Sequence, residues 1–350
     1  MRGATRERID VLASALRQCP AHLSDLVSKY RHGNPALSQW IANTRASGLR
    51  VAVVVMIERF GDIVACLPVA HHLKQTRPNI AIAWVCAKRF SSLAECNPSV
   101  DRVFHDESIS SWLLTKRLLP RDVDCYELFL DTQRCTWTGI KAQKRKSGVT
   151  LANYLSDGSH LLLAYSRAAG LWDVPDIQPE LHLPELDTYW RMRIEGKPVM
   201  AVHFDSEDPD RRLRIESATA FIDKALACGW TIVELGLRPI VSERNPTVLF
   251  PGRTLSLIQQ IALLGASDHF SGGFSGFMVC ANALSKPATV FIGTFRNFSK
   301  ITPVSGEFWR ENWDCVYGPW QASNCPVLVA DKHVPLPTAS MQFQNRNATC

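Results

Sequence analysis

The stretch that decides the interpretation of this chain is Glu58-Arg59-Phe60-Gly61-Asp62-Ile63-Val64. It follows an apolar run, residues 51–57, whose length and branched side chains predict a buried strand. Behind it, apolar residues recur with helical spacing at Ile63, Leu67, Ala70 and Leu73. We therefore expect Gly61 in a strand-to-helix turn, with Asp62 at or next to the N-terminus of the helix.

A carboxylate in that position has two interpretations. The dipole of a helix favours an ionised carboxylate at its N-terminus, so in the first interpretation Asp62 only caps the helix. In the second, the same ionised group lies at the mouth of an α/β cleft and acts as a general base. Spacing alone leaves both open.

Strand and helix patterns alternate in two series along the chain. The first series predicts strands at 51–57, 80–86, 101–104 and 126–130, with helices at 62–75 and 91–96. The second predicts strands at 198–204, 231–235, 268–270 and 288–292, with helices at 217–228, 257–264 and 277–284. Pro68 falls inside the first long helix and is expected to kink it or to begin it.

This alternation is typical of α/β folds with parallel sheets. A polar, proline-bearing stretch joins the two series, so we expect two Rossmann-like domains facing across a cleft. The predicted boundaries are a helical N-terminal extension at 1–48, a first domain at 49–185, a second at 186–335 and a tail at 336–350. Ligands of such folds bind outside the carboxyl ends of the strands.

Composition narrows the classes of protein. The 350 residues are 46% hydrophobic and 21% charged, and no apolar run approaches the ~20 residues of a membrane span. The eleven cysteines are scattered, with no C-x-x-C pair, which indicates reduced thiols in a cytoplasm. The net charge of +6 suits anionic substrates or the negative inner face of a membrane. Aromatic and basic residues do not interleave, so nucleic-acid binding is not expected.

Several segments then resemble one family. They are Arg59-Phe60-Gly61-Asp62-Ile63-Val64, Leu67-Pro68, Pro98-Ser99-Val100-Asp101-Arg102-Val103, Ser275-Gly276, Lys286-Pro287 and Phe291-Ile292-Gly293-Thr294. Over residues 50–330 the chain resembles the ADP-heptose:lipopolysaccharide heptosyltransferases. The resemblance implies a GT-B fold and an inverting, metal-independent glycosyl transfer without a cofactor. It also implies a nucleoside-diphosphate sugar donor such as ADP-heptose, and a glycan or lipid-linked acceptor reached from the cytoplasm, with peripheral contact to the inner membrane.

The resemblance also implies roles for individual residues. Asp62 falls on the catalytic base, with Arg59 and Gly61 on the acceptor side. Arg211, or as second choice Arg212, falls on the basic residue that meets the leaving diphosphate. The donor loop falls on the glycine-rich stretch Ser271-Gly272-Gly273-Phe274-Ser275-Gly276, with Gly273, Ser275 and Gly276 as its donor-binding residues. Backbone N–H groups at a helix N-terminus suit a diphosphate. For a glutamate that contacts the ribose, both Glu234 and Glu243 remain, and Glu243 is preferred because it lies in the loop.

The chain departs from the family pattern in this donor loop. The expected aspartate and histidine are Phe274 and Val279 here. This departure motivates a second hypothesis, a non-catalytic relative that binds a nucleotide or glycan. A nucleotide-dependent oxidoreductase is a weaker third, because the first βα turn lacks G-x-G-x-x-G. Asp122-Val123-Asp124 and Asp208-Pro209-Asp210 match the Asp-x-Asp pattern of metal-dependent transferases, but such pairs are common by chance, and no metal site is expected.

Overall fold

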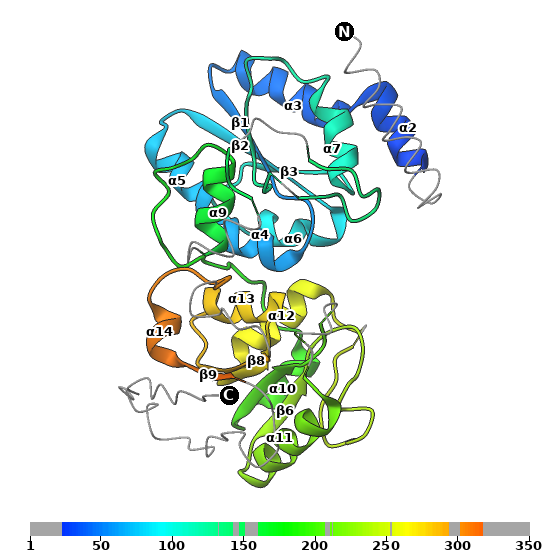
Figure 1. The fold of residues 1–350 in the computed structure, drawn as a ribbon, viewed down its shortest axis with the longest axis vertical. Coiled ribbons are helices and arrows are strands. Elements are labelled where there is room, and N and C mark those ends of the chain that lie inside the picture. Colours follow the sequence, from blue (N-terminus) through cyan, green and yellow to red (C-terminus); the bar gives the residue numbers. More distant parts are fainter. Residues whose placement is uncertain are drawn as a thin grey trace, which may run out of the picture.

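The computed structural model describes residues 23–131, 133–142, 147–150, 160–206, 211, 213–252, 254–293 and 302–317. Two sheets, each built only of parallel strand pairs, lie in the two halves of the molecule (Figure 1). The first has the order β3-β2-β1-β4, with β1 at Arg50–Val55, β2 at Ile80–Cys86, β3 at Arg102–His105 and β4 at Asp124–Glu127. The second has the order β6-β5-β7-β8-β9, with β5 at Val199–His203, β6 at Thr231–Glu234, β7 at His269–Gly273, β8 at Ala288–Gly293 and β9 at Trp313–Tyr317.

Helices connect and cover these strands. In the first half they are α2 (Leu23–His32), α3 (Pro35–Ala46), α4 (Phe60–Cys66), α5 (Pro68–Thr76), the 3-10 turn η2 (Lys88–Phe90), α6 (Ser91–Glu95), α7 (Ile109–Lys116) and α9 (Leu161–Ala168). In the second half they are α10 (Thr188–Ile194), α11 (Ile215–Ala227), α12 (Leu257–Ala266), α13 (Gly276–Ala283) and α14 (Phe308–Asn312). The predicted α/β class, with two Rossmann-like sheets and a helical N-terminal part, is confirmed. None of the helices in the described ranges is long and apolar enough to cross a bilayer.

The strand β1 shows why its sequence is apolar throughout. Ala52 and Val54 pack into the core on one face of the sheet, and Val53 and Val55 pack into a separate core on the other. Successive side chains of a strand point to opposite faces, so a strand covered by helices on both sides needs a continuous apolar run.

Some boundaries differ from the predicted ones. The helix predicted at 62–75 is two helices that meet at Leu67, with Pro68 as the first residue of α5, where the missing N–H costs nothing. The strand predicted at 126–130 is β4, which ends at Glu127. The strand predicted at 268–270 is β7, which continues through Gly273, so the first two glycines of the predicted loop belong to a strand.

The N-terminal helix α2 is bound to the first sheet through a buried ion pair. Lys29 lies 2.5 Å from Asp106, which follows β3 and is fully buried. Burial raises the pKa of Asp106 to about 6, and Lys29 opposes that rise. Leu26 of the same helix packs on Leu114 of α7. Residues 1–22 and 336–350, part of the predicted extension and all of the predicted tail, lie outside the described residues.

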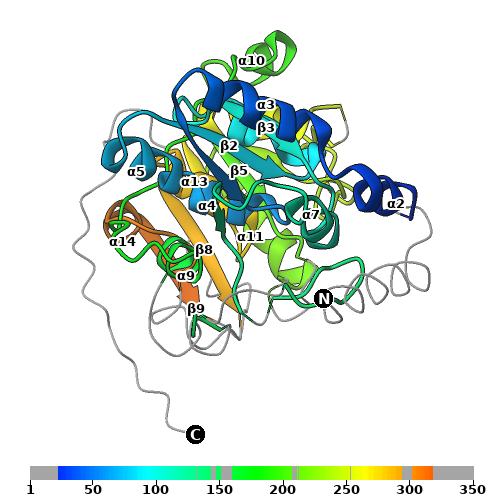
Figure 2. The same cartoon turned by 90° about the horizontal axis from the view of Figure 1, so that it is seen from above.

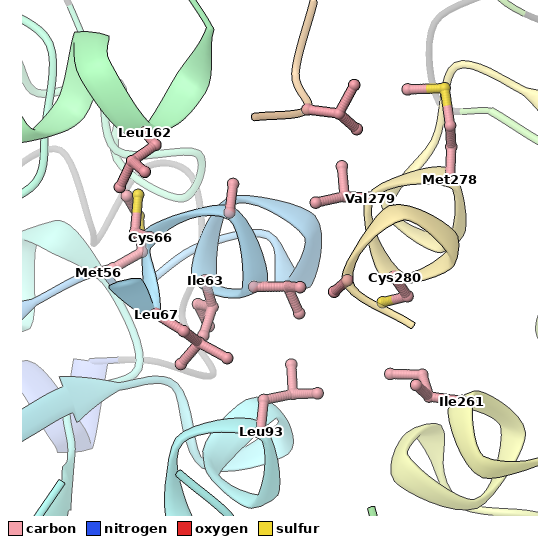
Figure 3. Packing of buried hydrophobic residues seen from close by; sticks show 14 of the residues in the cluster. Met56, Ile63, Cys66, Leu67, Leu93, Leu162, Ile261, Met278, Val279 and Cys280 are labelled. Atoms are coloured by element: carbon pink, nitrogen blue, oxygen red, sulfur yellow. The ribbon is translucent and has the colours of Figure 1, made fainter. Parts of the chain in front are cut away.

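The two halves meet through α4 and α13 (Figures 1 and 3). A Cβ added to Gly61 would lie 2.7 Å from the Cα of Gly276, and one added to Gly276 would lie 2.4 Å from the ring of Phe60. The two helix backbones are therefore in direct contact. Around this contact, Ile63 and Cys66 of α4 belong to the same buried cluster as α13 (Figure 3).

We predict that Gly61→Ala destabilises the protein by about 1–3 kcal/mol, because a methyl group cannot enter between two backbones without moving them apart. Thermal or urea unfolding would measure the loss. The matched control is Gly265→Ala in α12, where the new Cβ would meet side-chain ends and no backbone, Leu183 at 3.1 Å and Leu284 at 3.8 Å. Alanine favours a helix over glycine, so this control should lose little or gain. Equal stability of Gly61→Ala and wild type would contradict the described contact.

Candidate active site

The contact between α4 and α13 brings together the carboxyl ends of two strands. In the first sheet β1 lies between β2 and β4, and in the second β5 lies between β6 and β7, so the strand order reverses beside β1 and beside β5. Such a topological switch point is where open α/β sheets bind ligands. Asp62 follows β1, Arg211 follows β5, and Ser275 follows β7 next to β5. Viewed from above, α4 and α13 overlap, so the two switch points face each other (Figure 2).

Asp62 lies in the first turn of α4 with a partly buried side chain. The N-cap residue of this helix is Arg59, so Asp62 is not the helix cap. Its carboxylate Oδ2 accepts a hydrogen bond of 3.1 Å from the hydroxyl of Tyr165 in α9. The Asp62 side chain therefore bonds to a residue of another helix and does not cap α4.

Burial raises the pKa of Asp62 to about 6. The positive charge of Arg59, the hydrogen bond from Tyr165 and the charge of Arg211 lower it in that order, and the charge of Glu58 raises it slightly. Arg211 comes from the second half of the chain, so the two halves share one electrostatic site. A carboxyl group with a pKa near 6 is mostly ionised at neutral pH yet basic enough to accept a proton.

Arg59 has a strained backbone, with φ at 68° and ψ at 114°. A non-glycine residue in that region costs about 1–3 kcal/mol and persists only where the surrounding structure fixes it. The turn lets β1 pass directly into α4 and leaves the Arg59 side chain exposed beside Asp62.

Arg211 is positioned by an aromatic ring. Its guanidinium carbon lies 4.7 Å from the ring centroid of Phe274, and its carbonyl oxygen lies 3.0 Å from where a Cβ of Gly273 would be. Gly272 is likewise crowded by the carbonyl oxygen of His203, at 2.5 Å. The two glycines of β7 are therefore required by backbone oxygens of β5 and of the segment that follows it. Arg212 lies outside the described residues.

Ser275 and His203, at this end of the second sheet, each have a buried polar atom without a hydrogen-bond partner among the described residues. One is the Oγ of Ser275, the N-cap residue of α13, which makes no capping bond. The other is Nδ1 of His203, at the end of β5. The His203 ring packs 4.9 Å from that of Phe277, and burial lowers its pKa to about 4, so the imidazole is neutral. Both atoms are free to bind a ligand that enters this end of the sheet.

Of the two glutamates left open by the sequence, Glu234 has a structural role. Its carboxylate accepts hydrogen bonds of 2.8–3.0 Å from the backbone N–H groups of Ile240, Val241 and Ser242. It is almost fully buried, so it holds the loop after β6. Glu243 follows this loop with an exposed side chain, and its place in a nucleotide site stays a prediction.

Of the two Asp-x-Asp pairs, Asp122 and Asp124 lie away from these residues, and Asp208 and Asp210 lie outside the described residues. Asp122 pairs with Arg45, and Asp124 with Arg50 at 3.0 Å. In the part of the chain that the structure describes, no group of three or more His, Cys, Asp and Glu side chains could hold a metal ion. A pocket of about 530 Å³ lies between α10 and residues 246–255, and none of the residues named above lines it.

Tyr165 is the residue of this site that the sequence analysis missed. The run Leu161-Leu162-Leu163-Ala164 after His160 has helix-forming character, so α9 itself could have been predicted. Its partner Asp62 lies 103 residues away, and no local pattern indicates that pairing.

Comparisons with solved structures agree with this architecture. ADP-heptose LPS heptosyltransferase II of E. coli aligns with a TM-score of 0.56 and 15% identity, covering 77% of this chain and 90% of that one. E. coli heptosyltransferase WaaC, solved with ADP, gives 0.54 and 15%, covering 77% and 93%. A glycosyltransferase of family 9 from Veillonella parvula gives 0.54 and 13%, covering 77% and 86%. No family model matches the chain. The search of curated proteins found no significant match. At these identities the likeness confirms the predicted GT-B fold.

The raised pKa of Asp62 predicts how stability depends on pH. Between the unfolded value of 3.8 and the folded value of about 6, the folded state holds a proton that the unfolded state has released. Stability therefore falls as the pH rises through this window. Asp62→Asn removes this loss, so its stability relative to wild type should increase by about 2 kcal/mol from pH 4 to pH 7.

Urea unfolding at several pH values measures this difference. Asp223→Asn, at an exposed position of α11, is the matched control for removing one carboxylate. A stability difference between Asp62→Asn and wild type that does not change with pH would show that Asp62 titrates alike in both states.

Proposed function

We propose that the protein is an inverting glycosyltransferase that moves a heptose-like sugar from a nucleoside-diphosphate donor to a lipopolysaccharide or other surface glycan. The observation that carries this proposal is Asp62, a carboxylate with a pKa near 6 at the junction of two switch points, in the electrostatic reach of Arg59 and Arg211. The GT-B fold supports the reaction class.

In the proposed reaction Asp62 takes the proton from an acceptor hydroxyl. The hydroxyl oxygen attacks the anomeric carbon, and the bond from that carbon to the diphosphate breaks, so the nucleoside diphosphate leaves with the electron pair. Inversion follows because attack and departure occur on opposite faces. Arg59 and Gly61 lie on the acceptor side of this scheme.

The leaving diphosphate gains negative charge, and three features of the second half suit it. Arg211 supplies a guanidinium that can bind phosphate oxygens bidentately. The N-terminus of α13 at Gly276 presents backbone N–H groups and a positive dipole end. The Oγ of Ser275 lacks a partner among the described residues. Gly273 brings the loop of Arg211 close to β7.

The identity of the donor is proposed from Arg211 and from the neighbours of similar fold. The ring of Phe274 orients the guanidinium of Arg211 without neutralising it, as a carboxylate at that position would. ADP-heptose is one candidate, and neighbours of similar fold were solved with ADP and as ADP-heptose enzymes. We place the enzyme in the cytoplasm, at the inner surface of the membrane that would present a lipid-linked acceptor, consistent with the net charge of +6.

A specific observation also favours a non-catalytic binding protein. Val279 faces α4 with its Cγ2 3.6 Å from the position of a Gly61 Cβ, so an apolar side chain fills the place where the family pattern has histidine. In this alternative the protein binds a nucleotide, but the contact of α4 and α13 prevents sugar transfer.

We predict that nucleoside diphosphates stabilise the protein against heat and that Arg211→Ala removes most of this effect. A ligand at ~100 times its dissociation constant adds ~2.7 kcal/mol. ADP, UDP, GDP, CDP and their common sugar conjugates are compared by thermal shift. Arg214→Ala, an exposed arginine of the same loop, is the control and should respond as wild type does. Loss of the shift in both variants would mean non-specific attraction, and no shift in wild type would contradict a donor site.

The second prediction separates enzyme from binding protein. Asp62→Asn keeps the shape and removes the base, so it should reduce transfer by at least about 100-fold while nucleotide stabilisation persists. Transfer is followed by release of the nucleoside diphosphate with the stabilising donor. Turnover retained in Asp62→Asn would overturn the base assignment, and binding without turnover in wild type would favour the alternative.

A further inference from the structure

The hydrogen bond between Tyr165 and Asp62 joins two helices of the first half. Tyr165 Oη donates to Asp62 Oδ2 at 3.1 Å, from α9 to α4. The Tyr165 side chain is only 6% exposed and packs in the same buried cluster as Ile63 and Cys66 of α4. The ring is thus fixed by packing, and a fixed donor restricts the rotation of the carboxylate that it binds.

The helix that carries Tyr165 is fixed from both halves of the molecule. His160, its N-cap residue, forms a parallel bridge with Thr302 and lies 3.0 Å from the carboxylate of Asp176. Asp176 also accepts a hydrogen bond of 2.7 Å from the backbone N–H of Gly306. On the other side, Leu162 of α9 lies against α4 (Figure 3).

A carboxylate has two oxygens, and a general base uses one of them. We propose that Tyr165 is a positioning residue for the base: its hydroxyl holds Oδ2 of Asp62 so that Oδ1 is the oxygen presented to the acceptor hydroxyl. This inference rests on the proposed function for its catalytic consequence and on the hydrogen bond alone for its structural part. The phenol touches no reacting atom.

The charged and titratable groups around Asp62 set the background for this bond. Glu58 lies in the turn between β1 and α4, and Arg59 is the N-cap residue of α4. Cys66 lies one turn further along α4, and Arg211 comes from the second half. Burial raises the pKa of Cys66 well above its usual range, so this thiol stays neutral and adds no charge. Tyr165 is the neutral hydrogen-bond donor of the group, and its removal changes no formal charge.

The test is Tyr165→Phe, with Tyr126→Phe as the matched control. Tyr126 is also a buried tyrosine of the first half, and its hydroxyl accepts a hydrogen bond from Arg77, the C-cap residue of α5, and not from or to Asp62. The first measurement is titration of the side-chain carboxyl carbons by NMR, with Asp62→Asn identifying the signal of Asp62. Loss of a donor that favours the ionised form should raise the Asp62 midpoint by about half to one pH unit in Tyr165→Phe only.

The second measurement is the pH profile of kcat/KM with the donor that stabilises the protein. The acid limb should move upward by the same amount in Tyr165→Phe, with kcat reduced about 10-fold at pH 7 and nucleotide stabilisation unchanged. A purely structural role would lower stability in both variants without moving the limb. An unchanged Asp62 midpoint in Tyr165→Phe overturns the proposal, and so does a normal rate at every pH.

The two measurements keep this proposal separate from the proposed function. The NMR titration needs no turnover, so a shifted midpoint in a protein that transfers no sugar supports the hydrogen bond and rejects the enzyme. If the enzyme is active but the titration midpoint of Asp62 is unchanged in Tyr165→Phe, the positioning role of Tyr165 is rejected and Asp62 remains the proposed base.

Discussion

The backbones of α4 and α13 touch at Gly61 and Gly276, and the candidate site depends on that contact because it brings groups of the second half, such as Arg211, to Asp62 of the first. A Cβ on either glycine would overlap its neighbour, at 2.7 Å for Gly61 and 2.4 Å for Gly276. Because no side chain separates them, the N-termini of the two helices lie close together. The carboxyl ends of the strands that precede them, β1 and β7, and of β5 next to β7, therefore lie close together as well. The site is thus assembled by a contact between halves that are distant in sequence.

The burial of Asp62 near this contact changes its pKa. Burial raises the pKa of Asp62, and Arg59, Tyr165 and Arg211 limit the rise. The opposing effects leave the carboxyl group with a pKa of about 6, between a surface aspartate and a fully desolvated one. The strained φ of 68° at Arg59 belongs to the same arrangement, because the turn that places this charge beside Asp62 must reverse directly from strand to helix.

The sequence was informative where a local pattern carries the structure. The apolar run of β1, the helix break at Pro68 and the position of Asp62 in the first turn all follow from short-range rules. The predicted glycine-rich loop was partly wrong because Gly272 and Gly273 continue β7, where the carbonyl oxygens of His203 and Arg211 require them.

Long-range partners were not predictable in this way. Tyr165 bonds to Asp62 across 103 residues of sequence. Glu234 is not a candidate for binding the ribose, because its carboxylate accepts hydrogen bonds from the backbone N–H groups of the following loop. Neither fact has a signature in spacing, because both depend on how separate elements pack. Periodicity therefore predicted the two α/β series and the place of Asp62 near a helix N-terminus, the family resemblance suggested its role, and tertiary contacts supplied its partners.

The two departures from the family pattern place packed apolar side chains where that pattern has polar ones. Val279 lies on the side of α13 that meets Gly61, where an imidazole would be buried against a backbone. Phe274 packs partly into the core and carries the guanidinium of Arg211 on its ring. The close contact of α4 and α13 thus favours an apolar side chain at position 279, and the stacking of Arg211 favours an aromatic ring at position 274. It follows that a donor bound here would be recognised through Arg211, the Oγ of Ser275 and the N–H groups of α13, and not through side chains at positions 274 and 279.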